Sequence, residues 1–359
     1  MPAPLVSAAL PNDLRQAWTA WDGEVVYPTE TLGAVAHSGG LLVRRPELTV
    51  GVVRAVSGLS ALEIELLARR PLDRRDATER QRDIREGRSR QPAAVARRLL
   101  PAWDEGIDLR VGRLDDTGRV HWEFATSCSS SGGDHFLGES GPTYRAVFRF
   151  PPAFDRMSLV LAWPEIGFPE TVITVPLPDR TTVERATASI WQAPVDVFPV
   201  PDGLTHHIAD RHHPPAVEAG TNVAPPRVLH RRDHRVAVVL ARLTAVDSLL
   251  SMELHSIARD VSTKTINARG FSRRGPSRLL DDPARIRTVG PGASVAVVQG
   301  HEAFWIRSGD GSFSGGDRTF SGVQEFTLNR PHGDVLDLVV AWPLAGLDDV
   351  RVRIPLKPA

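Results

Sequence analysis

The sequence predicts an all-β protein made of two tandem, duplicated antiparallel β-sandwich modules, immunoglobulin-like or related, with short helical insertions. The first observation is an internal repeat. Residues 159–180 (LVLAWPEIGFPETVITVPLPDR) align without a gap on residues 338–359 (LVVAWPLAGLDDVRVRIPLKPA), with eight of 22 positions identical. The second is a shared spacing, because Trp122 and Trp305 each lie nine residues before a Ser-Gly-Gly-Asp segment. Together they indicate duplication of one module.

The length of the chain supports the same organisation, since 359 residues favour two domains that can each bury a core. We expect an N-terminal extension at 1–38 and a first module at 39–192, with a charged, partly helical insertion at 71–100. A Pro- and His-rich segment at 193–226 is typical of a linker, and the second module follows at 227–359.

The strands are predicted from their hydrophobic patterns. Residues 349–356 (DVRVRIPL) alternate apolar side chains with arginines, which indicates a strand with one buried face. Residues 159–163 and 338–342 are unbroken apolar runs and predict strands covered on both faces. Further strands are expected at 50–53, 61–68, 107–114, 119–125 and 143–150 in the first copy, and at 236–239, 249–257, 293–299, 302–307 and 323–328 in the second. Short helices are expected within 92–100 and 181–192.

The charge and cysteine content limit the classes of function that the chain can have. Lys plus Arg equals Asp plus Glu, so no global field favours nucleic acid or an anionic membrane. Cys128 is the single cysteine and cannot form an internal disulfide, which is typical of a reducing compartment. The N-terminus lacks a basic region followed by an apolar core. We therefore expect a cytoplasmic protein with no cofactor and no nucleic-acid partner.

The Gly-rich segments 127–142 and 308–317 are the first candidate sites for a ligand or partner, because such loops offer backbone amides and hydroxyls. Neither has the lysine of a phosphate-binding loop. Tight turns capped by Asp are the simpler interpretation, and an anion, a metal or a partner remains the alternative. The candidate residues are Ser131, Gly132, Gly133, Asp134, Asp310, Ser314, Gly315, Gly316 and Asp317.

A histidine cluster in the predicted linker is the most metal-like group, since imidazoles bind zinc, nickel and copper. It consists of His206, His207, His212 and His213. No cysteine accompanies these histidines and their spacing matches no structural zinc motif, so a solvated linker is the competing interpretation. Trp163 and Trp342 could stack on a sugar, but each follows an apolar strand and is expected to fill a core.

A thiol nucleophile at Cys128 is a further alternative, with His121 or His135 as the base and Asp134 as the orienting group. At the aligned positions of the second copy Gly311 replaces Cys128, Phe304 replaces His121 and Arg318 replaces His135. A cysteine-dependent hydrolase built on Cys128 is thus an alternative hypothesis that the internal repeat does not support.

The hairpin segment AWPEIGFPETVITVPLPDRTTVERATASIW at 162–191 resembles that of a group of actinobacterial proteins, in which a similar Trp-Pro hairpin precedes an Ala-rich helix. Residues 109–120 (LRVGRLDDTGRV) are similar to the strand–turn–strand of the same group. This resemblance covers about a third of the chain and implies a β-sandwich fold and an actinobacterial lineage. The group has no established activity, so no mechanism follows from it.

The leading hypothesis is a non-catalytic protein that binds another protein, as an assembly or accessory component, because neither copy contains a catalytic constellation. The sequence leaves open whether the chain forms homo-oligomers. The alternatives are a small-ligand or carbohydrate-binding protein that uses the Gly-rich loops, and the hydrolase built on Cys128.

Overall fold

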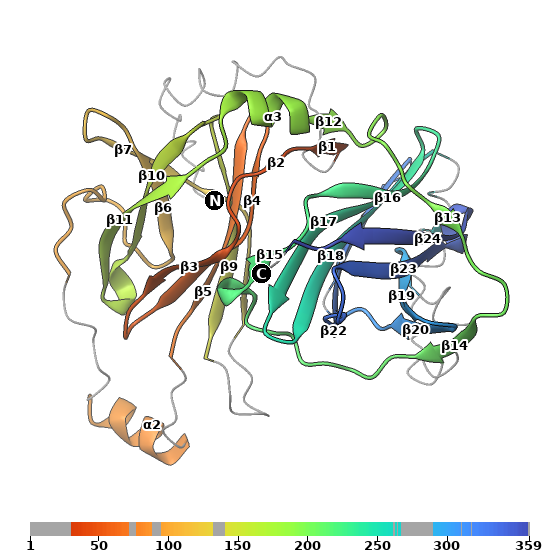
Figure 1. Cartoon of the computed structure of the whole chain (residues 1–359). Coiled ribbons are helices and arrows are strands. Elements are labelled where there is room, and N and C mark those ends of the chain that lie inside the picture. Colours follow the sequence, from red (N-terminus) through yellow and green to blue (C-terminus); the bar gives the residue numbers. More distant parts are fainter. Residues whose placement is uncertain are drawn as a thin grey trace, which may run out of the picture.

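The computed structural model describes residues 30–71, 77–87, 95–131, 141–260, 263, 265–266, 290–309, 311–316 and 318–357. These residues form a mostly β protein with several antiparallel sheets (Figure 1). Two α-helices are described, α2 (Ala77–Arg85) and α3 (Arg180–Ala186). Among the described residues, no helix has the length and apolar character needed to cross a membrane.

The N-terminal half contains two larger sheets. One has the order β2–β4–β5–β9–β8, with β3 (Gly40–Arg44) also paired to β4, and the other has the order β11–β10–β6–β7. The strands are β2 (Ala34–Val35), β4 (Thr49–Ser57), β5 (Leu62–Arg69), β6 (Arg110–Leu114), β7 (Val120–Glu123), β8 (Ala125–Ser131), β9 (Thr143–Phe150), β10 (Arg156–Trp163) and β11 (Phe168–Pro176).

The C-terminal half repeats this strand order. One sheet runs β15–β17–β18–β22–β21, with β16 (Arg227–Arg232) also paired to β17, and the other runs β13–β24–β23–β19–β20–β14. The strands are β13 (Phe198–Pro199), β14 (Thr205–Ile208), β15 (Thr221–Asn222), β17 (Val236–Val246), β18 (Leu249–Arg259), β19 (Ser294–Gln299), β20 (Glu302–Ile306), β21 (Gly311–Gly315), β22 (Thr319–Asn329), β23 (Val335–Trp342) and β24 (Leu347–Pro355).

Each half buries a hydrophobic core between its two sheets. In the first, alternate residues of β5 such as Leu62 and Ile64 pack with Leu159 of β10, and in the second Met252 of β18 packs with Leu338 of β23. This two-residue period places every other side chain of a strand inward. The cores therefore arise from the alternation that is visible in the sequence.

The Trp-Pro hairpins have the same geometry in both halves. After Trp163 and Trp342 the chain makes one turn of 3-10 helix, η2 (Pro164–Ile166) and η4 (Pro343–Ala345), which ends at a glycine. Gly167 has a φ of 79° and Gly346 a φ of 70°, a left-handed conformation that only glycine adopts without strain. Proline and glycine recur here because the turn geometry requires them.

Both hairpin tryptophans fill the cores, as predicted. Their side chains are 6% and 1% exposed, for Trp163 and Trp342 respectively. The Trp163 indole donates to the Ile107 carbonyl at 3.0 Å, and that of Trp342 to the Pro291 carbonyl at 2.8 Å. Neither indole presents a ring face to a ligand.

The helices differ in part from those predicted. The helix expected within 92–100 is wrong for residues 95–100, which are irregular, while α2 occupies 77–85 of the same insertion. The Glu170 carboxylate explains this, since it accepts from the backbone N–H groups of Arg98, Leu99 and Leu100 and thereby replaces helical hydrogen bonds. The helix expected at 181–192 is confirmed over α3 and is followed by the short strand β12 (Ala188–Ser189).

The segments expected to be an extension and a linker also pair with the sheets. Before β2, β1 (Thr31–Leu32) pairs with β12, and β2 itself pairs with β4. Within 193–226, β13 adds to β24, β14 runs parallel to β20, and β15 pairs with β17. The segment 193–226 therefore connects the two halves and also contributes strands to the second.

Candidate binding cleft between the two halves

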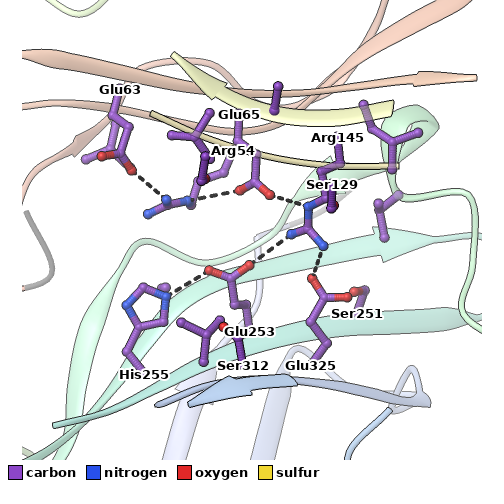
Figure 2. A pocket seen from close by; sticks show the side chains of 18 of the residues that line it. Arg54, Glu63, Glu65, Ser129, Arg145, Ser251, Glu253, His255, Ser312 and Glu325 are labelled. Atoms are coloured by element: carbon purple, nitrogen blue, oxygen red, sulfur yellow. Dashed lines mark hydrogen bonds and ion pairs between the residues drawn. The ribbon is translucent and has the colours of Figure 1, made fainter. Parts of the chain in front are cut away.

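The two halves meet through the outer faces of two sheets. The face of the β4–β5–β9–β8 sheet that points away from its core lies opposite the corresponding face of the β17–β18–β22–β21 sheet (Figure 2). Between them lies a cleft of about 1450 Å³, lined by side chains from both halves and by part of the segment 213–217. This junction is the candidate functional site.

Arg145 connects the halves at the centre of this cleft. From β9 its Nη1 donates to Glu325 Oε1 at 2.5 Å, and its Nη2 to Glu253 Oε2 at 3.1 Å, both in the C-terminal half (Figure 2). Its Nε donates to Glu65 on the neighbouring strand β5. One guanidinium therefore bridges carboxylates of both sheets, a geometry to which the five fixed donors of arginine are suited.

A second arginine occurs at the same place in each half. Arg54 on β4 lies opposite Glu65, and Arg242 on β17 lies opposite Glu253. The pairing register shifts immediately before each arginine, between Val52 and Arg54 and between Leu240 and Arg242. Such a β-bulge inserts one extra residue and so turns a side chain to the other face of the sheet. The bulge thus directs both arginines to the junction.

Arg242, Glu253 and Glu65 of this network are buried, and its other members are partly buried. Arg242 is 0% exposed, and its Nη2 donates to Glu325 at 3.1 Å while its Nη1 donates to Thr244 and Ser251. Burial opposes ionisation of Glu253, but a 2.9 Å hydrogen bond from His255 and the charges of Arg54, His255 and Arg242 outweigh it, so the pKa of Glu253 lies well below its ordinary value. Burial lowers the pKa of Arg145, yet the neighbouring glutamates raise it overall. Both shifts favour the charged forms of Glu253 and Arg145.

A short turn wedged between the halves adds a second ionic contact. The 3-10 turn η3 (Val217–Ala219) contacts β3, β4 and β5 of one half and β17 of the other. Its Glu218, 3% exposed, accepts two hydrogen bonds from Arg69. A Cβ at Gly51 would lie 2.0 Å from the Glu218 carbonyl oxygen, so this close approach requires glycine.

The Gly-rich segments lie partly at the rim of the cleft. Ser131 ends β8, which is the last strand of its sheet, and lines the cleft. Ser314 and Gly315 belong to β21, the last strand of the equivalent sheet, and the Gly316 N–H donates to the Thr319 carbonyl at 2.7 Å in a tight turn. The remaining candidates lie outside the described residues, namely Gly132, Gly133, Asp134, Asp310 and Asp317.

The four linker histidines have separate surroundings. The ring of His206 stacks on Trp305, and its Nδ1 accepts from the Trp305 indole at 3.0 Å. His207 stacks on Phe304, and His212 and His213 line two different cavities. Among the described residues, no group of three or more His, Cys, Asp and Glu side chains is placed to hold a metal ion. His206 acts here as a packing and hydrogen-bonding partner of β20.

The proposed thiol partners also take other positions. Cys128 is exposed on β8, and its thiol hydrogen-bonds to Tyr144, whose pKa is raised to about 12 mainly by burial. His121 lies in the β6–β7 hairpin, where its Nε2 is 2.8 Å from the Asp115 carboxylate. Asp134 and His135 are outside the described residues. The described part of the chain therefore pairs Cys128 with a phenol and not with His121.

The sequence reasoning did not select the charge network, although a signal for it is present. Arg242 is the one charged residue in the eleven-residue strand β17, and Glu253 is the one acidic residue of β18, where it lies between Met252 and Leu254. Charged residues are rarely fully buried unless paired. A charge inside an apolar strand therefore predicts a buried partner, but does not say which.

Comparisons with known proteins assign this chain to no family. No protein-family model matches the chain, and no curated protein does. Similar solved structures include a conserved domain protein from Bacillus anthracis (7% identity, 86% of this chain and 77% of that chain, TM-score 0.20). Another is the N-terminal periplasmic domain of ScsB from Proteus mirabilis, with 9% identity over 90% of this chain and 100% of that chain and a TM-score of 0.20. Bovine butyrophilin is a third, with 10% identity over 92% of this chain and 98% of that chain and a TM-score of 0.18. At these TM-scores the likenesses carry no argument about this chain.

Proposed function

We propose that the protein is a non-catalytic binding protein that holds part of another protein in the cleft between two duplicated β-sandwich modules. The observation that carries this proposal is the cleft itself. Residues of both halves line it, and ion pairs of Arg145 with Glu253 and Glu325 connect the halves across it. Sites formed at the junction of two domains are common places for ligands. An assembly or accessory role fits such a junction.

The strand order supports an immunoglobulin-like type for the two modules. In chain order, the eight strands from β4 to β11 pair as first–second–sixth–fifth in one sheet and fourth–third–seventh–eighth in the other, and β17 to β24 repeat this pattern. The same order characterises immunoglobulin-like sandwiches that carry one extra strand. The repeated order, the paired bulges and the repeated Trp-Pro hairpin support duplication of one immunoglobulin-like module.

The size of the cleft favours a polypeptide over a small ligand. Typical small-molecule pockets have volumes of roughly 300–1,000 Å³, whereas this cleft measures about 1450 Å³ and is open to solvent at β8. Burial of Trp163 and Trp342 also removes the two aromatic platforms that a sugar would need. A polar small ligand at the Gly-rich rim remains the second candidate, favoured by the serines there.

A capture experiment with cleft-filling variants tests this function. Ser129→Trp and Ser312→Trp place an indole in the cleft from opposite halves, and both serines are exposed, so the fold tolerates the change. Thr174→Trp on the exposed part of β11, outside the cleft, is the matched control. The tagged protein is purified from native lysate, and we expect one captured protein that both cleft variants lose and the control keeps. Capture that ignores the cleft variants contradicts the function, and so does no capture at all.

A further inference from the structure

Resting on the proposed function, we propose that the partner enters the cleft as an extended, uncharged segment that adds as a new strand along Thr126–Ser130 of β8, at the edge that no described strand pairs. An edge strand presents unpaired backbone N–H and C=O groups, and extended peptides bind such edges through main-chain hydrogen bonds. β8 ends its sheet, and its residues from Thr126 to Ser131 are all exposed and all line the cleft.

The composition of β8 sets it apart from other strands at sheet ends. Proteins usually protect free edges with charged side chains, prolines or very short strands. β7 carries Glu123, β11 carries Pro169 and Glu170, and β2 and β15 are two residues long. The seven residues of β8 (ATSCSSS) include neither a charge nor a proline. This edge is thus open to pairing.

The equivalent strand β21 is a poorer docking edge. It is five residues long, and only Gly311 and Ser312 of it line the cleft. β8 in contrast is preceded by Phe124, whose side chain is 80% exposed. An exposed aromatic residue beside an open edge gives an incoming strand an apolar contact. The partner segment is therefore expected to place an apolar residue over Phe124.

The charge of the cleft indicates an uncharged partner. Four arginines and four glutamates line it: Arg54, Arg69, Arg145, Arg149, Glu63, Glu65, Glu253 and Glu325. Arg145 already contacts glutamates of both halves and Arg54 contacts Glu63 and Glu65 of its own half, so the lining carries no excess of either sign to attract a charged segment. Ser129 of β8, which lies opposite Arg145 in the strand register, faces these pairs and suits a small or hydroxyl side chain in the partner (Figure 2).

Two proline variants test strand addition at β8. In a paired edge strand the N–H groups point alternately toward the neighbouring strand and toward solvent. One of Ser129→Pro and Ser130→Pro therefore removes a bond to β9, and the other removes only an outward N–H, which edge strands tolerate. Thermal unfolding identifies the tolerated variant as the one whose melting temperature stays closer to that of the wild type. The other proline variant shows the effect of losing a hydrogen bond to β9.

The probe is a displayed library of random linear peptides selected on the full chain. We expect the enriched peptides to lack charged residues, to slow amide hydrogen exchange in β8, and to lose affinity at least about tenfold with the tolerated proline variant. Peptides that protect another segment, or bind that variant equally well, overturn strand addition at β8. So does a protein dimer that the tolerated variant converts to monomer, because a second copy then occupies the edge.

The outcomes separate this inference from the proposed function. If a lysate protein is captured in a manner that depends on the cleft but no linear peptide is enriched, strand addition is overturned and the binding function stands. If no protein depends on the cleft, both are overturned.

Discussion

At the scale of single residues, the junction is held by a charge network that Arg145 extends from one half to the other. Arg242 is completely buried and touches Glu325 and Glu253, and Arg145 reaches the same two glutamates from the first half. Replacing a buried ion pair by apolar residues can be neutral, but removing one partner leaves a charge without compensation. The arginines are therefore the sensitive positions.

Arg242→Met is expected to destabilise the protein by roughly 3–5 kcal/mol, the usual cost of breaking a buried ion pair from one side. Glu253 and Glu325 then remain at the junction with one arginine fewer. Chemical denaturation measures the change in the free energy of unfolding. Arg180→Met removes an exposed pair with Glu184 and serves as the control, with an effect within about 0.5 kcal/mol. Equal stability of the two variants contradicts the structural role of Arg242.

Two half-buried histidines predict a loss of stability in mild acid. Burial lowers the pKa of His37 and of His230, and the Nδ1 atom of each accepts a backbone N–H, from Gly39 and Arg231 respectively. The unfolded chain, with a histidine pKa of about 6.5, therefore binds more protons than the folded protein below that pH. Stability is fully present above the unfolded pKa and is lost as the pH falls through it.

The measurement is the melting temperature of wild type and of the double variant His37→Asn/His230→Asn, between about pH 7.5 and about pH 5. We expect the wild type to lose stability over this range and the double variant to lose less, since asparagine does not titrate. Identical slopes for the two proteins would show that these histidines titrate alike when folded and unfolded.

At the scale of the elements, the sequence predicts strands from the alternation of apolar and polar residues, and turns from proline and glycine. It does not predict the β-bulges. The predicted strands at 61–68 and 249–257 match β5 and β18, because apolar residues alternate with polar ones along much of both segments. The bulges in β4 and β17 have no marker in the sequence, although they decide that Arg54 and Arg242 face the junction. The helix missed at 77–85 is almost entirely charged and polar, so hydrophobic periodicity could not reveal it.

The turn η3 depends on one glycine of the neighbouring strand. Gly51→Ala puts a methyl group 2.0 Å from the Glu218 carbonyl oxygen, a backbone atom that cannot move without displacing η3. We expect a loss of about 2 kcal/mol or more from overpacking, together with weakening of the Arg69–Glu218 contact.

Gly58→Ala is the matched control, because the nearest atom to its Cβ is 3.5 Å away, an ordinary contact. Thermal denaturation of both variants, with limited proteolysis of the segment 213–220, measures the effect. A Gly51→Ala protein as stable and as resistant as the control contradicts a tightly wedged η3.

At the scale of the whole molecule, Arg145 joins two halves that each have their own core. Arg145→Leu leaves Glu65, Glu253 and Glu325 facing one another across the junction. We expect calorimetric unfolding to change from one transition to two, because each core then unfolds separately. Arg351→Leu breaks an ion pair with Asp337 that lies within one half and is also partly buried. We expect this variant to lower the melting temperature and to keep a single unfolding transition. A single transition for Arg145→Leu excludes Arg145 as the coupling residue.

By itself, the sequence determined the repeated framework: the strand pattern, the Trp-Pro turns and the buried tryptophans all follow from local periodicity and backbone geometry. Only the tertiary structure decided where the candidate site lies. Arg145 and Glu325 are 180 residues apart along the chain, and no local pattern relates them. They meet because two sheet faces pack together, and the partners of a buried charge depend on that packing. The same packing opens the cleft beside β8, where the function is proposed.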